Sequence, residues 1–154
     1  MKRGDLVDEF ELPDQSGTMR KLSDLLSDGP VVLFFYPAAG TPGCTREACH
    51  FRDLAKEFGE VGASRVGIST DTVDKQAKFS DNHHFDFPVL SDADGTVASA
   101  FDVKRGLLHK FMPVKRTTFV IDTDRKVLEV ISSEVNFNTH ADKALDVLRA
   151  RQSA

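Results

Sequence analysis

The chain has 154 residues, of which 40% are hydrophobic and 29% charged, and its formal net charge is −4. This length fits a single domain over residues 1–154, large enough to bury a core without a stabilising disulfide. An acidic chain without long basic runs does not fit a protein that coats nucleic acid or anionic membranes, so neither is an expected partner. We find no apolar stretch typical of a signal peptide or a membrane span, and the cytoplasm is therefore the expected compartment.

The first third of the chain predicts a hairpin, a buried strand and a long helix. Residues 12–26 indicate a hairpin-like turn followed by a short helix capped at Ser23. The apolar run PVVLFFYPA predicts a central strand that ends near Pro37, because proline cannot donate to a sheet ladder. After the loop AAGTPG, apolar residues recur at helical spacing from Ala48 to Phe58, with a stop expected at Gly59 or Gly62.

Strands and helices alternate through the rest of the chain. We expect a strand at 64–70, a helix at 71–84, a strand at 87–92, a short helix at 96–103, two strands within 117–133 and a closing helix at 139–152. This order predicts an α/β fold with a central mixed β-sheet flanked by helices, and it suits a thioredoxin-like sandwich. A flavodoxin-like sheet has a similar pattern, but no glycine-rich phosphate loop follows the first strand.

The two cysteines, Cys44 and Cys49, lie in the stretch TPGCTREAC, where several roles have to be weighed. Helix positions five residues apart have α-carbons roughly 8.6 Å apart, whereas a disulfide needs less than about 7 Å, so a permanent bridge is disfavoured. A zinc site lacks a second cluster of ligands, and the spacing is not that of a C-x-x-C oxidoreductase. Burial as two inert small side chains remains open.

The position of Cys44 favours a reactive thiol. It follows Gly43 at the expected start of a helix, where free amides and the macrodipole favour a thiolate. Thr41, three residues earlier, offers a hydroxyl group. Cys49 lies within the helix next to Ala48, and its own surroundings leave its role open.

The stretch YPAAGTPGCTREACHFRD resembles the active-site segment of peroxiredoxins, whose signature is P-x-x-x-T/S-x-x-C. Pro37, Thr41 and Cys44 stand at its three fixed positions. The four residues between the cysteines, together with FPVLSD and RTTFVID downstream, are similar to the peroxiredoxin Q subgroup, also called bacterioferritin comigratory proteins. The likeness extends through nearly the whole chain.

The resemblance implies a thiol peroxidase of the atypical two-cysteine type on a thioredoxin-like fold. Cys44 would be the peroxidatic cysteine, which hydrogen peroxide or an organic hydroperoxide oxidises to a sulfenic acid. Cys49 would be the resolving cysteine, which closes an intramolecular disulfide after the turn between them unwinds.

The resemblance also assigns the substrate pocket. Thr41 and Arg116 would hold and polarise the peroxide, and Arg116 suits this role because it stays charged and presents several fixed donors. Gly43 would supply a backbone amide, and Pro37 would shield the pocket. Glu47 would orient the arginine.

Thioredoxin is the reductant that the resemblance favours, with glutaredoxin as the alternative, and no metal, haem or flavin cofactor is implied. A monomer is sufficient when the resolving cysteine is internal, and a dimer is the other option. Two other classes are a peroxide sensor or redox chaperone that uses Cys44 without turnover, and a thioredoxin-like binding module with inert thiols. The basic stretch at 104–116 is interpreted as a loop over the pocket rather than a nucleic-acid site.

Overall fold

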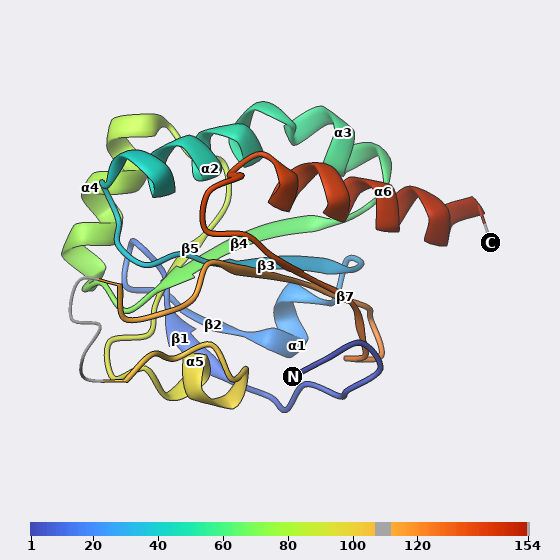
Figure 1. The fold of residues 1–154 in the computed structure, drawn as a ribbon, viewed down its shortest axis with the longest axis horizontal. Coiled ribbons are helices and arrows are strands. Elements are labelled where there is room, and N and C mark those ends of the chain that lie inside the picture. The colour runs from blue at the N-terminus through green and yellow to red at the C-terminus, as the bar shows by residue number, and fades with distance from the viewer. Residues whose placement is uncertain (107–111, 154) are drawn as a thin grey trace.

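The computed structural model of the chain describes residues 1–106 and 112–153 (Figure 1). The basic stretch at 104–116, predicted to cover the pocket, lies partly outside the described residues. The strands are β1 (Glu11–Pro13), β2 (Met19–Lys21), β3 (Val31–Phe35), β4 (Ser64–Ser69), β5 (Val89–Ser91), β6 (Thr117–Ile121) and β7 (Val127–Ser132). The helices are α1 (Leu22–Leu25), α2 (Pro42–Asp53), α3 (Ala55–Glu60), α4 (Val73–His83), α5 (Thr96–Ala100) and α6 (Thr139–Ser153).

The central sheet is mixed, as the order of elements predicts. Its five strands run in the order β5-β4-β3-β6-β7, and β1 and β2 form a separate two-stranded sheet. Strand β3 pairs in parallel with β4 and antiparallel with β6, so it occupies the middle position. The register places Phe35 at the end of β3 opposite Thr117 at the start of β6. The residues that follow β3 and the residues that precede β6 therefore meet at the same end of these two neighbouring strands.

Helices cover both faces of this sheet (Figure 1). Helices α2, α3, α4 and α6 lie on one side, whereas α1, α5 and the small β1-β2 sheet lie on the other. Because side chains alternate along a strand, β3 contributes to both layers of the core. Val31, Leu33 and Phe35 pack in the layer of α1 and α5, and Val32 and Phe34 pack in the layer of α2 and α6. This double burial explains why β3 reads as an unbroken apolar run.

The long helix predicted up to Gly59 or Gly62 is interrupted. Helix α2 ends at Asp53, and α3 begins at Ala55 after Leu54 adopts φ −97° and ψ 21°. Each segment keeps its own aromatic anchor in the core, since Phe51 in α2 and Phe58 in α3 are both fully buried. The break therefore lets two short helices follow the twisted surface of the sheet while the apolar spacing continues across it.

The cap predicted for the first short helix is wrong by two residues. Helix α1 follows Lys21, and Ser23 instead donates through its hydroxyl and its amide to the Glu9 carboxylate. Helix α4 is capped by Thr72, whose hydroxyl accepts from the Lys75 amide, and Asp71 is left free for another contact. That contact, described below, lies in the loop before α2.

Within the described part of the chain, no helix combines the length and the apolar character that a membrane span requires.

The packing of α2 on the sheet generates a stability prediction. The Phe51 ring stacks on Phe34 of β3, with 4.2 Å between ring centroids and 9° between planes. Phe51→Ala leaves a cavity there and is expected to lower the free energy of unfolding by about 3–5 kcal/mol in urea denaturation. Val135, which is 83% exposed, serves as control, and Val135→Ala is expected to change stability by less than about 0.5 kcal/mol. Equal effects of the two substitutions would contradict this account of α2.

Candidate active site

Cys44 lies in the first turn of α2, where the sequence predicts it. Thr41 is the N-cap residue, and the Thr45 amide donates to the Thr41 carbonyl at 2.9 Å as the helix begins. The amides of Gly43 and Cys44 precede that bond, so they have no partner within the helix. The Cys44 side chain is only 1% exposed. A sulfur at this position faces free amides in surroundings from which water is largely removed.

Arg116 is the cation beside this sulfur. Its Nη2 donates to Cys44 Sγ at 3.4 Å, and its Nη1 donates to Glu47 Oε1 at 2.8 Å. Arg116 directly precedes β6, whereas Cys44 and Glu47 lie on successive turns of α2 and face the same side. The structure therefore brings together three predicted site residues, and one guanidinium group links them.

Burial sets the electrostatics of this cluster. Arg116 is 5% exposed and Glu47 is 0% exposed. Burial works to lower the pKa of Arg116, but Cys44 and Glu47 beside it raise it overall, so the guanidinium stays charged. For Glu47 burial outweighs the attraction of Arg116 and raises its pKa to about 8. Only one of the two Glu47 carboxyl oxygens has a hydrogen-bond partner among the described residues, which also favours the protonated form.

The loop between β3 and α2 forms the rim of the site. Pro37 is buried directly after the strand, and Gly40 adopts φ +80°, a conformation that favours glycine. The exposed Thr41 hydroxyl donates to the Ala38 carbonyl at 2.7 Å. The Ala39 amide donates to the Asp71 carboxylate, also at 2.7 Å. These bonds hold the loop against the end of β4 and fix where Thr41 lies.

Gly43 is in close contact with the opposite wall. A Cβ atom added at Gly43 would lie 2.8 Å from Phe137 Cζ and 3.3 Å from Arg116 Nη2. The Phe137 ring in turn lies against the guanidinium group, with 4.9 Å from Arg116 Cζ to the ring centroid. A side chain at position 43 would push both groups away, so glycine is required by this close approach.

A second layer of polar residues lies behind Glu47. His140 at the start of α6 is fully buried, with its Nδ1 atom 3.5 Å from Glu47 Oε2 and 2.8 Å from Thr118 Oγ1. Glu134 accepts from the Arg116 amide at 3.0 Å and from Arg105 Nη2 at 2.7 Å. The sequence analysis missed these residues and Phe137. Thr118 lies on the same face of β6 as Val120, toward α2 and α6. A polar residue on this apolar face was the one sign in the sequence of a buried polar cluster.

Cys49 lies farther along α2 and is half-buried, and both cysteines are free thiols in this structure. Burial raises the pKa of the Cys49 thiol above its usual range, against a smaller lowering by Arg52. The thiol is thus protonated at neutral pH while the helix is intact. Because the two cysteines share one continuous helix, α-carbons five residues apart remain roughly 8.6 Å from each other, beyond the reach of a disulfide.

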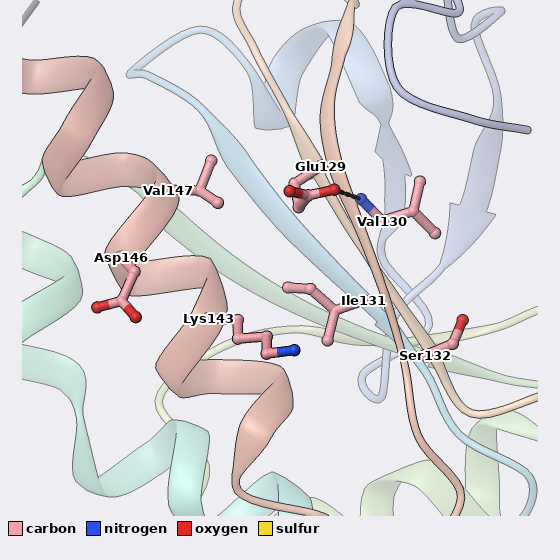
Figure 2. Close-up of a pocket in the computed structure, with 7 residues that line it drawn as sticks. All are labelled: Glu129, Val130, Ile131, Ser132, Lys143, Asp146 and Val147. Carbon is pink, nitrogen blue, oxygen red and sulfur yellow. Dashed lines mark hydrogen bonds between the residues drawn. The ribbon is translucent and has the colours of Figure 1, made fainter.

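The structure also shows what else this chain could hold. Among residues 1–106 and 112–153, no group of three or more His, Cys, Asp and Glu side chains is arranged to bind a metal ion. A pocket of about 510 Å³ lies between the edge strand β7 and α6 (Figure 2). Its ionisable lining residues are Glu129, Lys143 and Asp146, and no thiol reaches it. The two thiols of the chain, Cys44 and Cys49, both lie on α2 and not at this pocket.

Comparisons with known proteins agree with this geometry. The model of the AhpC/TSA family matches residues 3–130. Peroxiredoxin Bcp of Bacillus subtilis is 36% identical over 149 residues, which cover 95% of this chain and 94% of that protein. The crystal structure of peroxidoxin BcpB from Mycobacterium tuberculosis superposes with a TM-score of 0.94 and 77% identity over 97% of each chain.

A structure of the bacterioferritin comigratory protein of Xanthomonas campestris, described for its alkyl peroxide reduction activity, has a TM-score of 0.83 and 32% identity, covering 92% of this chain and 91% of that one. These neighbours confirm the thioredoxin-like fold predicted from the order of elements. The family match spans most of the chain, and the relatives align nearly end to end. The chain therefore belongs to the AhpC/TSA family and, within it, to the peroxiredoxin Q or bacterioferritin comigratory protein subgroup of thiol peroxidases.

Proposed function

We propose that this chain, acting as one domain, reduces hydrogen peroxide and organic hydroperoxides with Cys44 as the peroxidatic nucleophile. The observation that carries the proposal is the contact of 3.4 Å between Arg116 Nη2 and Cys44 Sγ at the start of α2. A thiolate is the nucleophilic form of cysteine, and a neighbouring cation and a helix N-terminus both stabilise it. The site supplies both.

The proposed reaction is an attack of the Cys44 thiolate on one oxygen of the peroxide. The S–O bond forms while the O–O bond breaks, and the departing oxygen takes up a proton and leaves as water or an alcohol. The sulfur is oxidised to a sulfenic acid, and the peroxide is reduced. Negative charge builds on the departing oxygen, so donors fixed near it lower the barrier. Arg116 and the amides of Gly43 and Cys44 are the donors available here.

Thr41 holds the peroxide in this proposal as a hydrogen-bond acceptor. Its hydroxyl hydrogen is engaged with the Ala38 carbonyl, which leaves the oxygen lone pairs for an O–H group of the substrate. Pro37 keeps water from the sulfur, and Glu47 orients Arg116. The small residues Ala38, Ala39 and Gly40 line a pocket of about 410 Å³ next to this loop, which offers room for the alkyl group of an organic hydroperoxide.

Cys49 is proposed to resolve the sulfenic acid. The S–O bond of oxidised Cys44 breaks as a disulfide forms, and water leaves. The helical separation of the two residues requires that α2 unwind between them, which also exposes Cys49 and removes the burial that raises the pKa of its thiol. Thioredoxin, or alternatively glutaredoxin, then reduces the disulfide. An internal resolver lets a monomer in the cytoplasm complete this cycle.

Peroxide turnover tests the function as a whole. The wild-type chain is expected to consume a large excess of hydrogen peroxide when thioredoxin, its reductase and NADPH are supplied, and Cys44→Ser is expected to consume none above background. The measurement is NADPH oxidation. If the wild type stops after one equivalent of peroxide, it acts as a sensor rather than as a peroxidase, and the proposal fails.

Thr41→Val is expected to slow the reaction of Cys44 with hydrogen peroxide by about ten- to a thousandfold, because one polar contact to the reacting oxygens is lost. Competition for peroxide with a haem peroxidase gives the second-order rate constant. Thr41→Ser keeps the hydroxyl and is expected to stay close to the wild type. An unchanged rate in Thr41→Val would exclude this role.

Cys49→Ser tests resolution. After one equivalent of peroxide, mass spectrometry of the wild type is expected to show an internal disulfide, and the variant is expected to retain a sulfenic or sulfinic acid on Cys44. A disulfide between two chains of the variant, formed as fast as the internal one, would instead show that resolution is intermolecular.

A further inference from the structure

Only one of the two carboxyl oxygens of Glu47 has a hydrogen-bond partner among the described residues. Its Oε1 atom accepts from Arg116, whereas its Oε2 atom is buried and has no hydrogen-bond partner among the described residues. His140 Nδ1 lies 3.5 Å from Glu47 Oε2. Both side chains are 0% exposed, so bulk solvent does not reach the unpaired oxygen. An unpartnered carboxyl oxygen in such a place is costly unless something else satisfies it.

The hydrogen bonds of His140 define what its ring can offer. Its Nε2 atom lies 2.9 Å from the Ser133 carbonyl, which can only accept, so Nε2 carries a hydrogen. In the neutral ring Nδ1 then has a lone pair, and it accepts from the Thr118 hydroxyl at 2.8 Å. With Glu47 ionised and His140 neutral, Glu47 Oε2 and His140 Nδ1 would face each other as two acceptors.

One additional proton removes this conflict, whichever atom carries it. On Glu47 Oε2 it makes the carboxyl group a donor toward His140 Nδ1, and the Thr118 hydroxyl then turns its hydrogen away because Nδ1 has a single lone pair. On Nδ1 it makes an imidazolium ring that can donate to Glu47 Oε2 and to Thr118, whose hydroxyl accepts as readily as it donates. In both arrangements the pair has no net charge.

We propose that Glu47 and His140 share one proton in the active enzyme, and that His140 is thereby a positioning residue for Arg116. This inference rests on the proposed function of Cys44 and Arg116. A neutral pair lets Glu47 orient the guanidinium group through Oε1 without neutralising it, so the positive charge acts on the Cys44 sulfur and the peroxide. Loss of the proton would add a buried negative charge beside Arg116 and oppose the thiolate.

The charged groups around the pair are consistent with a retained proton. Arg116, directly before β6, contacts both Glu47 and Cys44 of α2, Glu134 accepts from the Arg116 amide in the segment after β7, and His140 faces Glu47 from α6. Burial raises the pKa of Glu47 to about 8, with Arg116 opposing and Glu134 adding to the rise. Burial also lowers the pKa of His140, with a further lowering by Arg116. The two groups together therefore hold one proton at neutral pH, and it leaves near pH 8.

The discriminating variant is Glu47→Gln, a neutral side chain of the same shape. Its carbonyl oxygen can accept from Arg116, and its amide can donate to His140 Nδ1, as the protonated acid does. The readout is the rate constant for Cys44 oxidation by hydrogen peroxide as a function of pH. Competition with a haem peroxidase measures it, because the chain contains no tryptophan to report oxidation directly.

The wild-type rate constant is expected to fall as pH rises past about 8. Glu47→Gln is expected to lose this fall, because its side chain has no proton to release in this pH range. His140→Gln is expected to move the fall to lower pH by about one unit, because the protonated carboxyl group loses the basic imidazole nitrogen, which is a stronger acceptor than a glutamine carbonyl oxygen. His84→Gln, the same change at an exposed histidine, is expected to leave the profile in place.

The opposite results would overturn the inference. If Glu47 must be a charged carboxylate, Glu47→Gln breaks a buried ion pair and slows the reaction by about a hundredfold or more while circular dichroism shows a folded protein. A profile that His140→Gln does not move would likewise exclude the positioning role. Cys44→Ser separates the two proposals, since peroxide reduction that survives its loss would contradict the proposed function and not the shared proton.

A spectroscopic readout on the wild type is independent of activity and of variant folding. In nitrogen-15 NMR of the histidine rings, the Nδ1 resonance of His140 is expected to change as pH passes about 8, when the pair loses its proton. Glu47→Gln, in which no such proton exists, assigns the change. A His140 Nδ1 resonance that stays constant from mildly acidic to strongly alkaline pH would refute the shared proton.

Discussion

The active site of this peroxiredoxin depends on one buried cation and on the sheet topology that delivers it. Arg116 lies 72 residues from Cys44 in the chain, yet its guanidinium group contacts the sulfur. The antiparallel pairing of β3 with β6 places the end of one strand beside the start of the other, and α2 begins directly after that edge. A guanidinium group that is 5% exposed needs buried acceptors, and α2 supplies two of them from successive turns. Strand pairing and helix docking thus assemble the site together.

The same helix imposes opposite demands on the two cysteines. Its first turn presents free amides to Cys44, so the intact helix serves the reaction with peroxide. Its regular rise keeps Cys49 out of disulfide range, and burial raises the pKa of the Cys49 thiol, so the intact helix opposes the proposed resolving step. In the proposed cycle, a resolving cysteine five residues along a helix couples the chemistry to a local loss of structure, and the stability of α2 would set how readily the second step follows the first.

Much of this arrangement is readable from the sequence, because it is local. The apolar run of β3, the proline that ends it and the spacing of Pro37, Thr41 and Cys44 all act within about twenty residues. What the sequence does not show is long-range. Phe137 and His140 reach the site from the segment around the start of α6, and nothing in their neighbours along the chain marks them. No glycine or proline lies at the break at Leu54, so the sequence does not predict it. His140 was assigned no role for the same reason.

The stacked contact between Phe51 and Phe34 holds the C-terminal end of α2 on the sheet. Cys44 and Cys49 both precede Phe51 in α2. After Phe51 the chain turns at Leu54 into α3, whose Phe58 is buried in the core. If α2 unwinds from its first turn, the unwinding reaches the buried Phe51 ring two residues after Cys49. The stacked ring would therefore limit how far α2 unwinds in the proposed cycle, so that the sheet and the remaining helices keep their places.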